Sequence, residues 1–265
     1  MLWMVVKLVT ALVAFVALLL AGPAYMLGWG GIDVAADWAT ASRERASLAP
    51  DPAATPEAVV QIYAARAFSW RGAFAAHTWI AVKPERARHY TLYEVMGWRR
   101  PTVSIHDNAP DRAWFGSPPQ LLAEVRGDQA AAAIPAIRAA AARYPYPQTY
   151  RLWPGPNSNS FVAWMVRQVP ALDVELPSIA VGKDYLIDDH DLLGRFFAPA
   201  PSNSGYQFSL FGLFGIMIAR QEGLEINVLG LVFGIDPLDW AIKLPGIGRI
   251  GRAPLVEDNR NARDY

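Results

Sequence analysis

The 265-residue chain has no cysteine. This absence excludes disulfide bonds, thiolate metal sites, a lipidated cysteine and a cysteine nucleophile. It does not identify the compartment, because a cysteine-free chain is stable on either side of a membrane.

The chain also has little charge, and neither sign is in excess. Only 18% of the residues are charged, and 24 basic residues balance 24 acidic ones. Nucleic-acid binding usually needs a long-range positive field, so we expect no nucleic-acid partner. Apolar residues make up 53% of the chain, which is enough for a sizeable buried core. Contact with a membrane would explain both the apolar excess and the low charge.

Long apolar runs are missing from most of the chain, but one lies at the N-terminus. Residues 8–32 contain no charged side chain, and Trp3, Tyr25 and Trp29 stand where interfacial aromatic residues are expected. About twenty such residues cross a hydrocarbon core of ~30 Å. We therefore predict that residues 1–32 form a single-pass anchor in the inner (cytoplasmic) membrane.

The orientation of this anchor follows from weaker signals. Lys7 precedes the predicted helix, and Arg43 and Arg45 follow it at the edge of the window that influences topology. Short N-terminal anchors commonly send the rest of the chain across, so we expect an extracytoplasmic body. A signal peptide cleaved near Gly22-Pro23-Ala24 is the alternative.

Beyond the anchor, the pattern predicts one α+β domain. Residues 33–56 lack sustained periodicity and are interpreted as a tether. Residues 57–251 show no fixed repeat and no strong internal boundary, and the polar segment 252–265 is expected to be a flexible tail. The fold class is a membrane helix plus a single antiparallel-sheet domain with packed helices.

Several elements of this domain can be predicted by residue range. An antiparallel meander is expected over Val59–Ala65, Phe74–Val82, His89–Val95 and Thr102–His106, where β-branched and aromatic residues gather. Helices are expected over Asp128–Arg143, with Asp128 as N-cap, and from about Asn157 to Gln168, with a short strand near Tyr150–Trp153 between them.

Two apolar segments occupy the C-terminal third, Phe208–Ala219 and Leu224–Ile235. Each is too short to span a membrane, and a charged segment separates them, so we predict a β-hairpin. Both faces of its strands read as apolar, and we expect both to be covered. Core burial is the favoured cover; contact with lipid or with a partner is the alternative.

Two further patterns predict neither a cofactor nor a metal. Residues 246–251 match G-x-G-x-x-G, but a dinucleotide site needs a following helix and an acidic residue about twenty positions on. Residues 188–191 read Asp-Asp-His-Asp, and adjacent residues on one stretch rarely converge on one ion. We interpret Asp191 as a helix cap.

A histidine and a serine form the candidate catalytic pair. His77 stands in an apolar strand, where an imidazole needs a hydrogen-bond partner. Ser158 follows a Pro-Gly-Pro turn at a helix start, where the helix dipole would stabilise an alkoxide. Asn157 and Asn159 flank it, and backbone N–H groups near Asn159 would form an oxyanion hole. The competing interpretation is that these residues only cap the helix.

These residues also carry a resemblance. His77-Thr-Trp-Ile with Asn157-Ser-Asn-Ser-Phe161 looks like a circularly permuted papain-like (NlpC-type) fold, with serine in place of the family's cysteine. The whole chain more closely resembles the bacterial domain-of-unknown-function family 3750. That resemblance covers roughly residues 60–250 and includes the motifs Glu222-Gly-Leu-Glu-Ile-Asn227, Phe233-Gly-Ile-Asp-Pro237 and Lys243-Leu-Pro-Gly-Ile-Gly248.

Two functions remain open at this point. The first is a membrane-tethered domain that keeps a papain-like cleft for binding an unknown envelope ligand. The second is a serine-dependent hydrolase or acyltransferase acting on an amide or ester. In the second, His77 must act as a general base oriented by a third polar group. His89, Glu94 and Asp107 are the candidates for that group.

Overall fold

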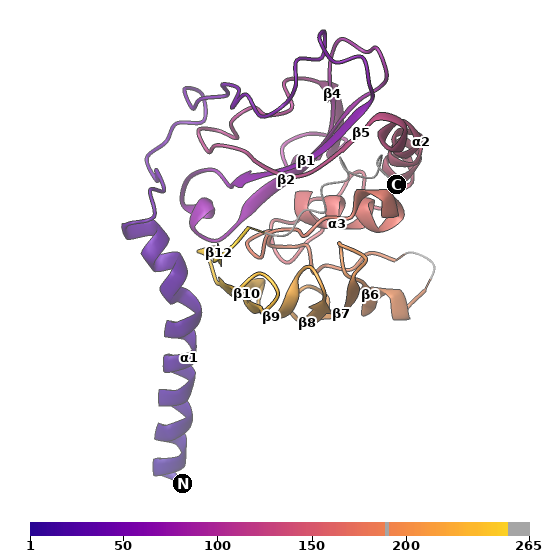
Figure 1. Ribbon diagram of the computed structural model, residues 1–265. Coiled ribbons are helices and arrows are strands. Elements are labelled where there is room, and N and C mark those ends of the chain that lie inside the picture. Colours follow the sequence, from indigo (N-terminus) through magenta and orange to yellow (C-terminus); the bar gives the residue numbers. More distant parts are fainter. Residues whose placement is uncertain (189–190, 254–265) are drawn as a thin grey trace.

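The computed structural model describes residues 1–188 and 191–253 (Figure 1). One N-terminal helix projects from a body built of two antiparallel sheets and two helices. This confirms the predicted α+β class with a single N-terminal candidate membrane helix.

Helix α1 (Leu2–Gly28) is long and apolar enough to cross a membrane. Residues 2–18 are exposed all round, whereas Leu19, Gly22, Pro23 and Met26 are buried against the body. A side chain at Gly22 would clash with the carbonyl oxygen of Pro245. The last turns of α1 therefore dock closely onto the body, and the rest of the helix stands free of it.

Part of the predicted tether is also docked. The Asp111 carboxylate accepts hydrogen bonds from the Arg45 side chain and from the backbone N–H groups of Leu48 and Ala49. The Ala113 N–H donates to the carbonyl of Glu44 at 2.8 Å. The second half of the 33–56 segment is thus held against the loop that follows the fourth strand.

The first sheet contains the predicted meander and one strand that the sequence pattern did not reveal. Its order is β4-β3-β2-β1-β5, and every pairing is antiparallel. Strand β5 pairs with the free edge of β1. The strands are β1 (Val59–Arg66), β2 (Ala76–Lys83), β3 (Thr91–Val95), β4 (Val103–Asp107) and β5 (Gln120–Arg126), with a 3₁₀ turn, η1 (Ser69–Ala73), before β2.

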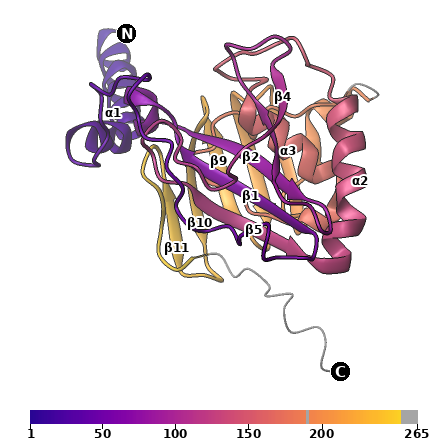
Figure 2. The same cartoon turned by 90° about the horizontal axis from the view of Figure 1, so that it is seen from above.

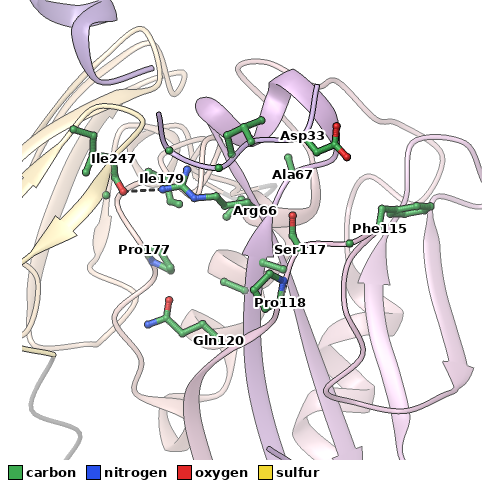
Figure 3. Close-up of a pocket in the computed structure, with 18 of the residues that line it drawn as sticks. Asp33, Arg66, Ala67, Phe115, Ser117, Pro118, Gln120, Pro177, Ile179 and Ile247 are labelled. Atoms are coloured by element: carbon green, nitrogen blue, oxygen red, sulfur yellow. Dashed lines mark hydrogen bonds between the residues drawn. The ribbon is translucent and has the colours of Figure 1, made fainter. Parts of the chain in front are cut away.

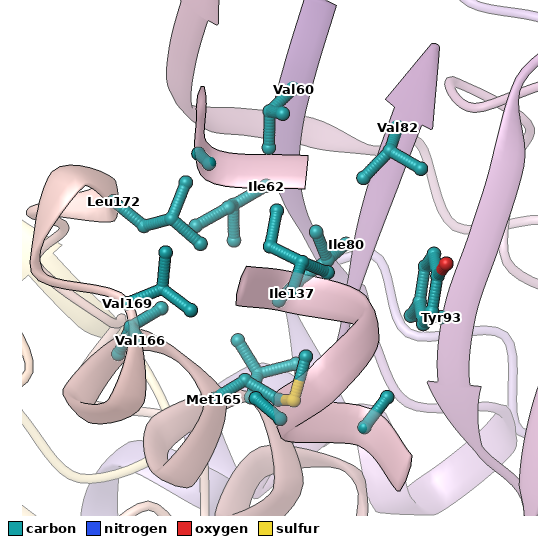
Figure 4. Close-up of a cluster of buried hydrophobic side chains, with 14 of the residues drawn as sticks. Val60, Ile62, Ile80, Val82, Tyr93, Ile137, Met165, Val166, Val169 and Leu172 are labelled. Atoms are coloured by element: carbon teal, nitrogen blue, oxygen red, sulfur yellow. The ribbon is translucent and has the colours of Figure 1, made fainter. Parts of the chain in front are cut away.

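The main core lies on one face of this sheet. Helices α2 (Gly127–Arg143) and α3 (Ser158–Gln168) pack there, and side chains from alternate positions of β1 and β2 meet them (Figure 4). The opposite face carries an aromatic cluster that includes Tyr63, Trp79 and Trp114. Because side chains alternate along a strand, β2 contributes Ile80 to the first face and Trp79 to the second.

Two local predictions in this region are wrong. The N-cap of α2 is Arg126, and Asp128 lies inside the first turn, where its charge faces the positive end of the helix. No strand forms at Tyr150–Trp153, which is an irregular segment leading into α3. The start of α3 agrees with the prediction, since its N-cap is Asn157.

The second sheet is larger than the predicted hairpin. Each apolar run folds into two strands, and the resulting sheet has the order β12-β11-β10-β9-β8-β7-β6. Turns with positive φ at Phe211-Gly212 and at Leu229-Gly230 divide the two runs. Its strands are β6 (Phe197–Pro199), β7 (Gly205–Leu210), β8 (Phe214–Ala219), β9 (Gly223–Val228), β10 (Leu231–Asp236), β11 (Ala241–Leu244) and β12 (Gly248–Ile250).

Helix α3 lies between the two sheets, so the body is layered in the order first sheet, α3, second sheet (Figures 1 and 2). Short 3₁₀ turns, η2 (Pro170–Leu172) and η3 (Leu193–Arg195), punctuate the chain from α3 to β6. The Arg167 guanidinium of α3 donates to the Pro199 carbonyl and to the Gln207 side chain. The face of the second sheet that points at α3 is therefore its inner face. Its outer face is exposed. The prediction that both faces of these strands would be covered is therefore wrong for the contacts within this chain.

Candidate functional site

Two large cavities open into the body, and only one of them contains the predicted site residues. The other, of about 910 Å³, lies between the end of β1 and the C-terminal strands (Figure 3). Arg66, one of the arginines that line it, already donates to the carbonyl groups of Gly72, Gly246 and Ile247. That guanidinium serves to join the two sheets.

The second cavity has a volume of about 1240 Å³, and we call it the aromatic cavity. His77, Asn157, Ser158 and Asn159 all line it. It extends past the first residues of β2 to the N-terminus of α3 and to the turn between β9 and β10. Its aromatic walls come from loops and from strand ends: Trp38, Phe68, Trp70, Phe74, Trp98, Trp114, Phe115, Tyr150 and Trp153.

At one end of the aromatic cavity, Glu94 of β3 gathers three cationic or titratable side chains. Its Oε2 lies 3.1 Å from Nε2 of His77, and its Oε1 accepts from the Arg112 guanidinium at 2.7 Å. His106 of β4 lies 3.4 Å from the same Oε1. The carboxylate is fully buried, and antiparallel strands β2, β3 and β4 bring these residues onto one face.

Arg112 and Trp114 come from the loop after β4 and cover this cluster. The Trp114 ring stacks on the His77 ring, with centroids 3.6 Å apart and planes 13° apart. The Arg112 guanidinium lies over the rings of Trp79 and Trp114. Its Nη1 atom is buried and has no hydrogen-bond partner, which leaves one donor beside the cavity unsatisfied.

The electrostatics of this cluster favour a neutral His77 and an ionised Glu94. Burial lowers the pKa of His77, although the hydrogen bond and charge of Glu94 act in the opposite sense. Burial alone would raise the pKa of Glu94, but His77, Arg112 and His106 outweigh it and hold that pKa below its ordinary value. In the tautomer of neutral His77 whose Nε2–H donates to Glu94, Nδ1 carries the lone pair.

At the other end of the cavity, Asn157 caps the N-terminus of α3. Its Oδ1 accepts hydrogen bonds from the N–H groups of Asn159 and Ser160, and the Ser160 hydroxyl accepts from the Asn157 N–H. This capping box identifies Asn157, rather than Ser158, as the capping side chain. A side chain at Gly182, where φ is +101°, would occupy the space of the Asn157 amide.

Asn159 joins α3 to β2. Its side-chain nitrogen donates to the carbonyl groups of Ala76 and Val181, and its oxygen accepts from the Thr78 hydroxyl. Its backbone N–H donates to Asn157, so one of the donors predicted for the oxyanion hole is already engaged within the protein.

His77 and Ser158 share the aromatic cavity but not a face of the sheet. Ser158 begins the helix that packs on the Thr78 side of β2, where the Thr78 hydroxyl lies 3.4 Å from the Ser158 carbonyl. His77 stacks with Trp79 and Trp114 on the other side. A catalytic pair would need His77 beneath the first turn of α3, and this requirement of the prediction is not met. No hydrogen bond joins the two side chains within the described residues.

Of the three candidates for the third polar group, Glu94 is the one bonded to His77. His89 and Asp107 pair with each other on the surface, 3.3 Å apart. His106, Arg112 and Trp114 were not predicted from the sequence. The strand alternation of β4 contained a usable signal for His106, but nothing local in the sequence placed the loop carrying Arg112 and Trp114 over β2.

The remaining motifs form local structure. The G-x-G-x-x-G segment makes the β11–β12 turn and strand β12, with positive φ at Gly246 and Gly248. Asp191 accepts from the Leu193 N–H at the start of η3. Asp189 and His190 of the Asp-Asp-His-Asp segment lie outside the described residues. Among residues 1–188 and 191–253, no group of three His, Asp or Glu side chains is placed to hold a metal ion.

Together these features define a class: an α+β protein with one candidate membrane helix and an aromatic-lined cavity beside a buried carboxylate–histidine–arginine cluster. Residues 57–185 match the model of a family described as "Protein of unknown function (DUF3750)", and this part of the chain belongs to that family. No curated protein matches the chain. No solved structure matches it either, so the papain-like relationship stays a hypothesis.

Proposed function

We propose that this domain binds an amphiphilic ligand of the cell envelope in the aromatic cavity and does not turn it over. The observation that carries the proposal is the composition of that cavity. Broad aromatic walls meet a buried donor, Nη1 of Arg112, that has no hydrogen-bond partner in the part of the chain that the structure describes. Ligand sites are commonly apolar with a few placed polar groups, and an acceptor headgroup would satisfy Arg112.

Three contacts favour binding over catalysis. His77 and Ser158 approach the cavity from opposite faces of β2. The Asn159 N–H, which an oxyanion hole would need, is already bonded to Asn157. Glu94 is held by Arg112 as well as by His77, so it anchors a static cluster. A serine nucleophile needs a base within hydrogen-bond reach, and none of these contacts supplies one.

The proposed setting is the inner membrane, with α1 retained and the body on the extracytoplasmic side. The buried contacts of Leu19, Gly22 and Met26 with the body support a helix that stays attached. Cleavage near Gly22 would cut through this docked part of α1.

A photoreactive fatty acid should test the binding site. With the full-length protein in detergent, cross-linking should label peptides that line the aromatic cavity. Trp98 is largely exposed on its wall and packs 6.0 Å from the Trp114 ring. Removing this indole in Trp98→Ala should weaken the binding of the fatty acid by about 1 kcal/mol, or about fivefold in affinity. The readout is labelled peptide by mass spectrometry, titrated against fatty acid concentration.

The matched control for that experiment is Trp240→Ala. Trp240 is even more exposed but lies away from the cavity, so its removal should leave cavity labelling unchanged. Equal labelling of Trp98→Ala and the unaltered protein would contradict binding in this cavity.

The alternative function is a serine-dependent hydrolase or acyltransferase, favoured by the His77–Glu94 hydrogen bond in the cavity that Ser158 also lines. A fluorophosphonate probe separates the two functions. Under the binding proposal, labelling of the full-length protein should equal that of Ser158→Ala. Labelling that disappears in both Ser158→Ala and His77→Ala, while the variants still melt cooperatively, would establish the hydrolase instead.

A further inference from the structure

The outer face of the second sheet is apolar without exception. Within β6 to β12, no charged side chain points outward, and the most exposed outward positions include Ile218 (66%) and Tyr206 (62%). The outward residues are Phe197, Pro199, Tyr206, Phe208, Leu210, Phe214, Ile216, Ile218, Leu224, Ile226, Val228, Leu231, Phe233, Ile235, Ile242, Leu244 and Ile250.

The strand registers join these side chains into continuous rows. Neighbouring strands pair Tyr206 with Ile218, Ile218 with Leu224, and Leu224 with Ile235. The row continues through Ile242 to Ile250 at the edge nearest α1. The apolar surface therefore crosses the whole sheet rather than forming scattered contacts.

The inner face of the same sheet holds charge. Glu225 of β9 binds Lys183 at 2.5 Å and Lys243 at 2.7 Å, and all three side chains are buried. Arg249 of β12 binds Asp236 of β10. An antiparallel sheet with one face in water normally has its apolar side chains inside and its polar ones outside. This sheet has the reverse order.

The position of α1 identifies what covers the outer face. Residues 2–18 of α1, exposed all round, are about 25 Å long, slightly less than a ~30 Å hydrocarbon core. The helix runs past the edge of the second sheet and extends beyond its outer face, on the side away from α3 (Figure 1). A bilayer crossed by this free part of α1 must therefore begin at the level of the sheet.

We propose that the outer face of β6–β12 lies on the lipid surface of the membrane that α1 crosses, with its apolar side chains in the interface. Lipid, rather than a second copy or another protein, is the occupant because α1 places the bilayer against this face. Trp240 and Leu238, in the turn between β10 and β11, are also exposed at the rim, where an interfacial tryptophan is expected. A large exposed apolar face of this kind marks a membrane or protein contact.

The absence of cysteine makes a direct test possible. Single-cysteine variants of the full-length protein, Ile218→Cys and Ile226→Cys, can carry one NBD fluorophore each without background labelling. Both side chains are exposed, so the substitutions leave the core intact. Leu12→Cys in the free part of α1 is the lipid control, and Arg86→Cys, in the exposed turn after β2, is the water control.

The variants are reconstituted in phosphatidylcholine vesicles, and each is exposed to nitroxide-labelled lipid and to iodide. Labels at positions 218 and 226 should lose most of their fluorescence to the lipid quencher, as position 12 does, and resist iodide. Quenching by iodide equal to that at position 86 would overturn the proposal. Protection from both quenchers would overturn it too, by showing that a second copy or another protein covers the sheet.

Discussion

Replacing Glu225 with alanine is expected to lower the free energy of unfolding by about 3–5 kcal/mol. Its carboxylate neutralises Lys183 and Lys243, which are both fully buried between α3 and the second sheet. Lys243 keeps Glu175 at 2.6 Å, but the carboxylate that remains near Lys183, that of Asp184, is 3.9 Å away. Removing Glu225 therefore leaves the Lys183 ammonium without a close anion in a site with little water, and that penalty exceeds the value of the lost contacts. Urea unfolding of the full-length protein in detergent, followed by tryptophan fluorescence, measures the change.

The matched control is Glu85→Ala. Glu85 also pairs with a basic residue, Arg86 at 3.4 Å, but both side chains are mostly exposed. Exposed pairs contribute about 0–1 kcal/mol, so this variant should unfold almost as the unaltered protein does. A loss below about 1 kcal/mol in Glu225→Ala would contradict the view that this buried network holds the inner face together.

The elements that the sequence predicted are those fixed by local patterns. The charge-free run gave α1, and the clusters of β-branched residues gave four strands of the first sheet. The start of α3 was predictable because Asn157 and Ser160 have the spacing of a capping box after a proline-glycine turn. Each of these signals lies within a few residues of the structure that it specifies.

The second sheet was predicted in part: strands were expected over both apolar runs, but not the turns within each run or the inverted order of the two faces. Glu225 and Asn227 alternate with Leu224 and Ile226, a clear strand pattern, but both faces were predicted to be apolar, whereas Glu225 and Asn227 are the buried members. Inside the apolar runs, the glycines at 212 and 230 mark tight turns with positive φ. The sequence contained these turns, yet a longer hairpin explained the apolar residues equally well.

The candidate site shows a different limit. Strand alternation places His77 on the same face as Trp79, but it cannot decide which face of β2 receives α3. Both faces of this strand look apolar, so the choice depends on packing between distant segments. For the same reason, the loop that brings Arg112 onto Glu94 could not be foreseen.

Glu94 is the residue on which the site cluster depends, and Glu94→Gln is expected to cost about 3–5 kcal/mol of unfolding free energy at pH 7. The amide fits the same space, but it removes the buried carboxylate that contacts both Arg112 and His77. The exposed residue His89 provides the control, and His89→Gln should change stability by less than about 0.5 kcal/mol. Equal stability of Glu94→Gln and the control would contradict a structural role for the carboxylate.

The pH dependence of the same variant gives an independent check with a defined sign. In the unaltered protein the lowered pKa of Glu94 contributes stability above about pH 4.5, which is lost as the pH falls through the folded value. His77 also has a lowered pKa, so its contribution is lost as the pH falls below about 6.5, where the unfolded chain takes up a proton first. Because Glu94 is what raises the pKa of His77 against burial, glutamine at position 94 should lower that pKa further. The two proteins should therefore lose stability together just below pH 6.5, and the variant should go on losing it below the folded pKa that His77 has in the unaltered protein. The loss that belongs to the Glu94 carboxylate below about pH 4.5 should disappear in the variant. Parallel urea titrations across this range measure both effects, and identical pH profiles for the two proteins would show that His77 does not depend on Glu94.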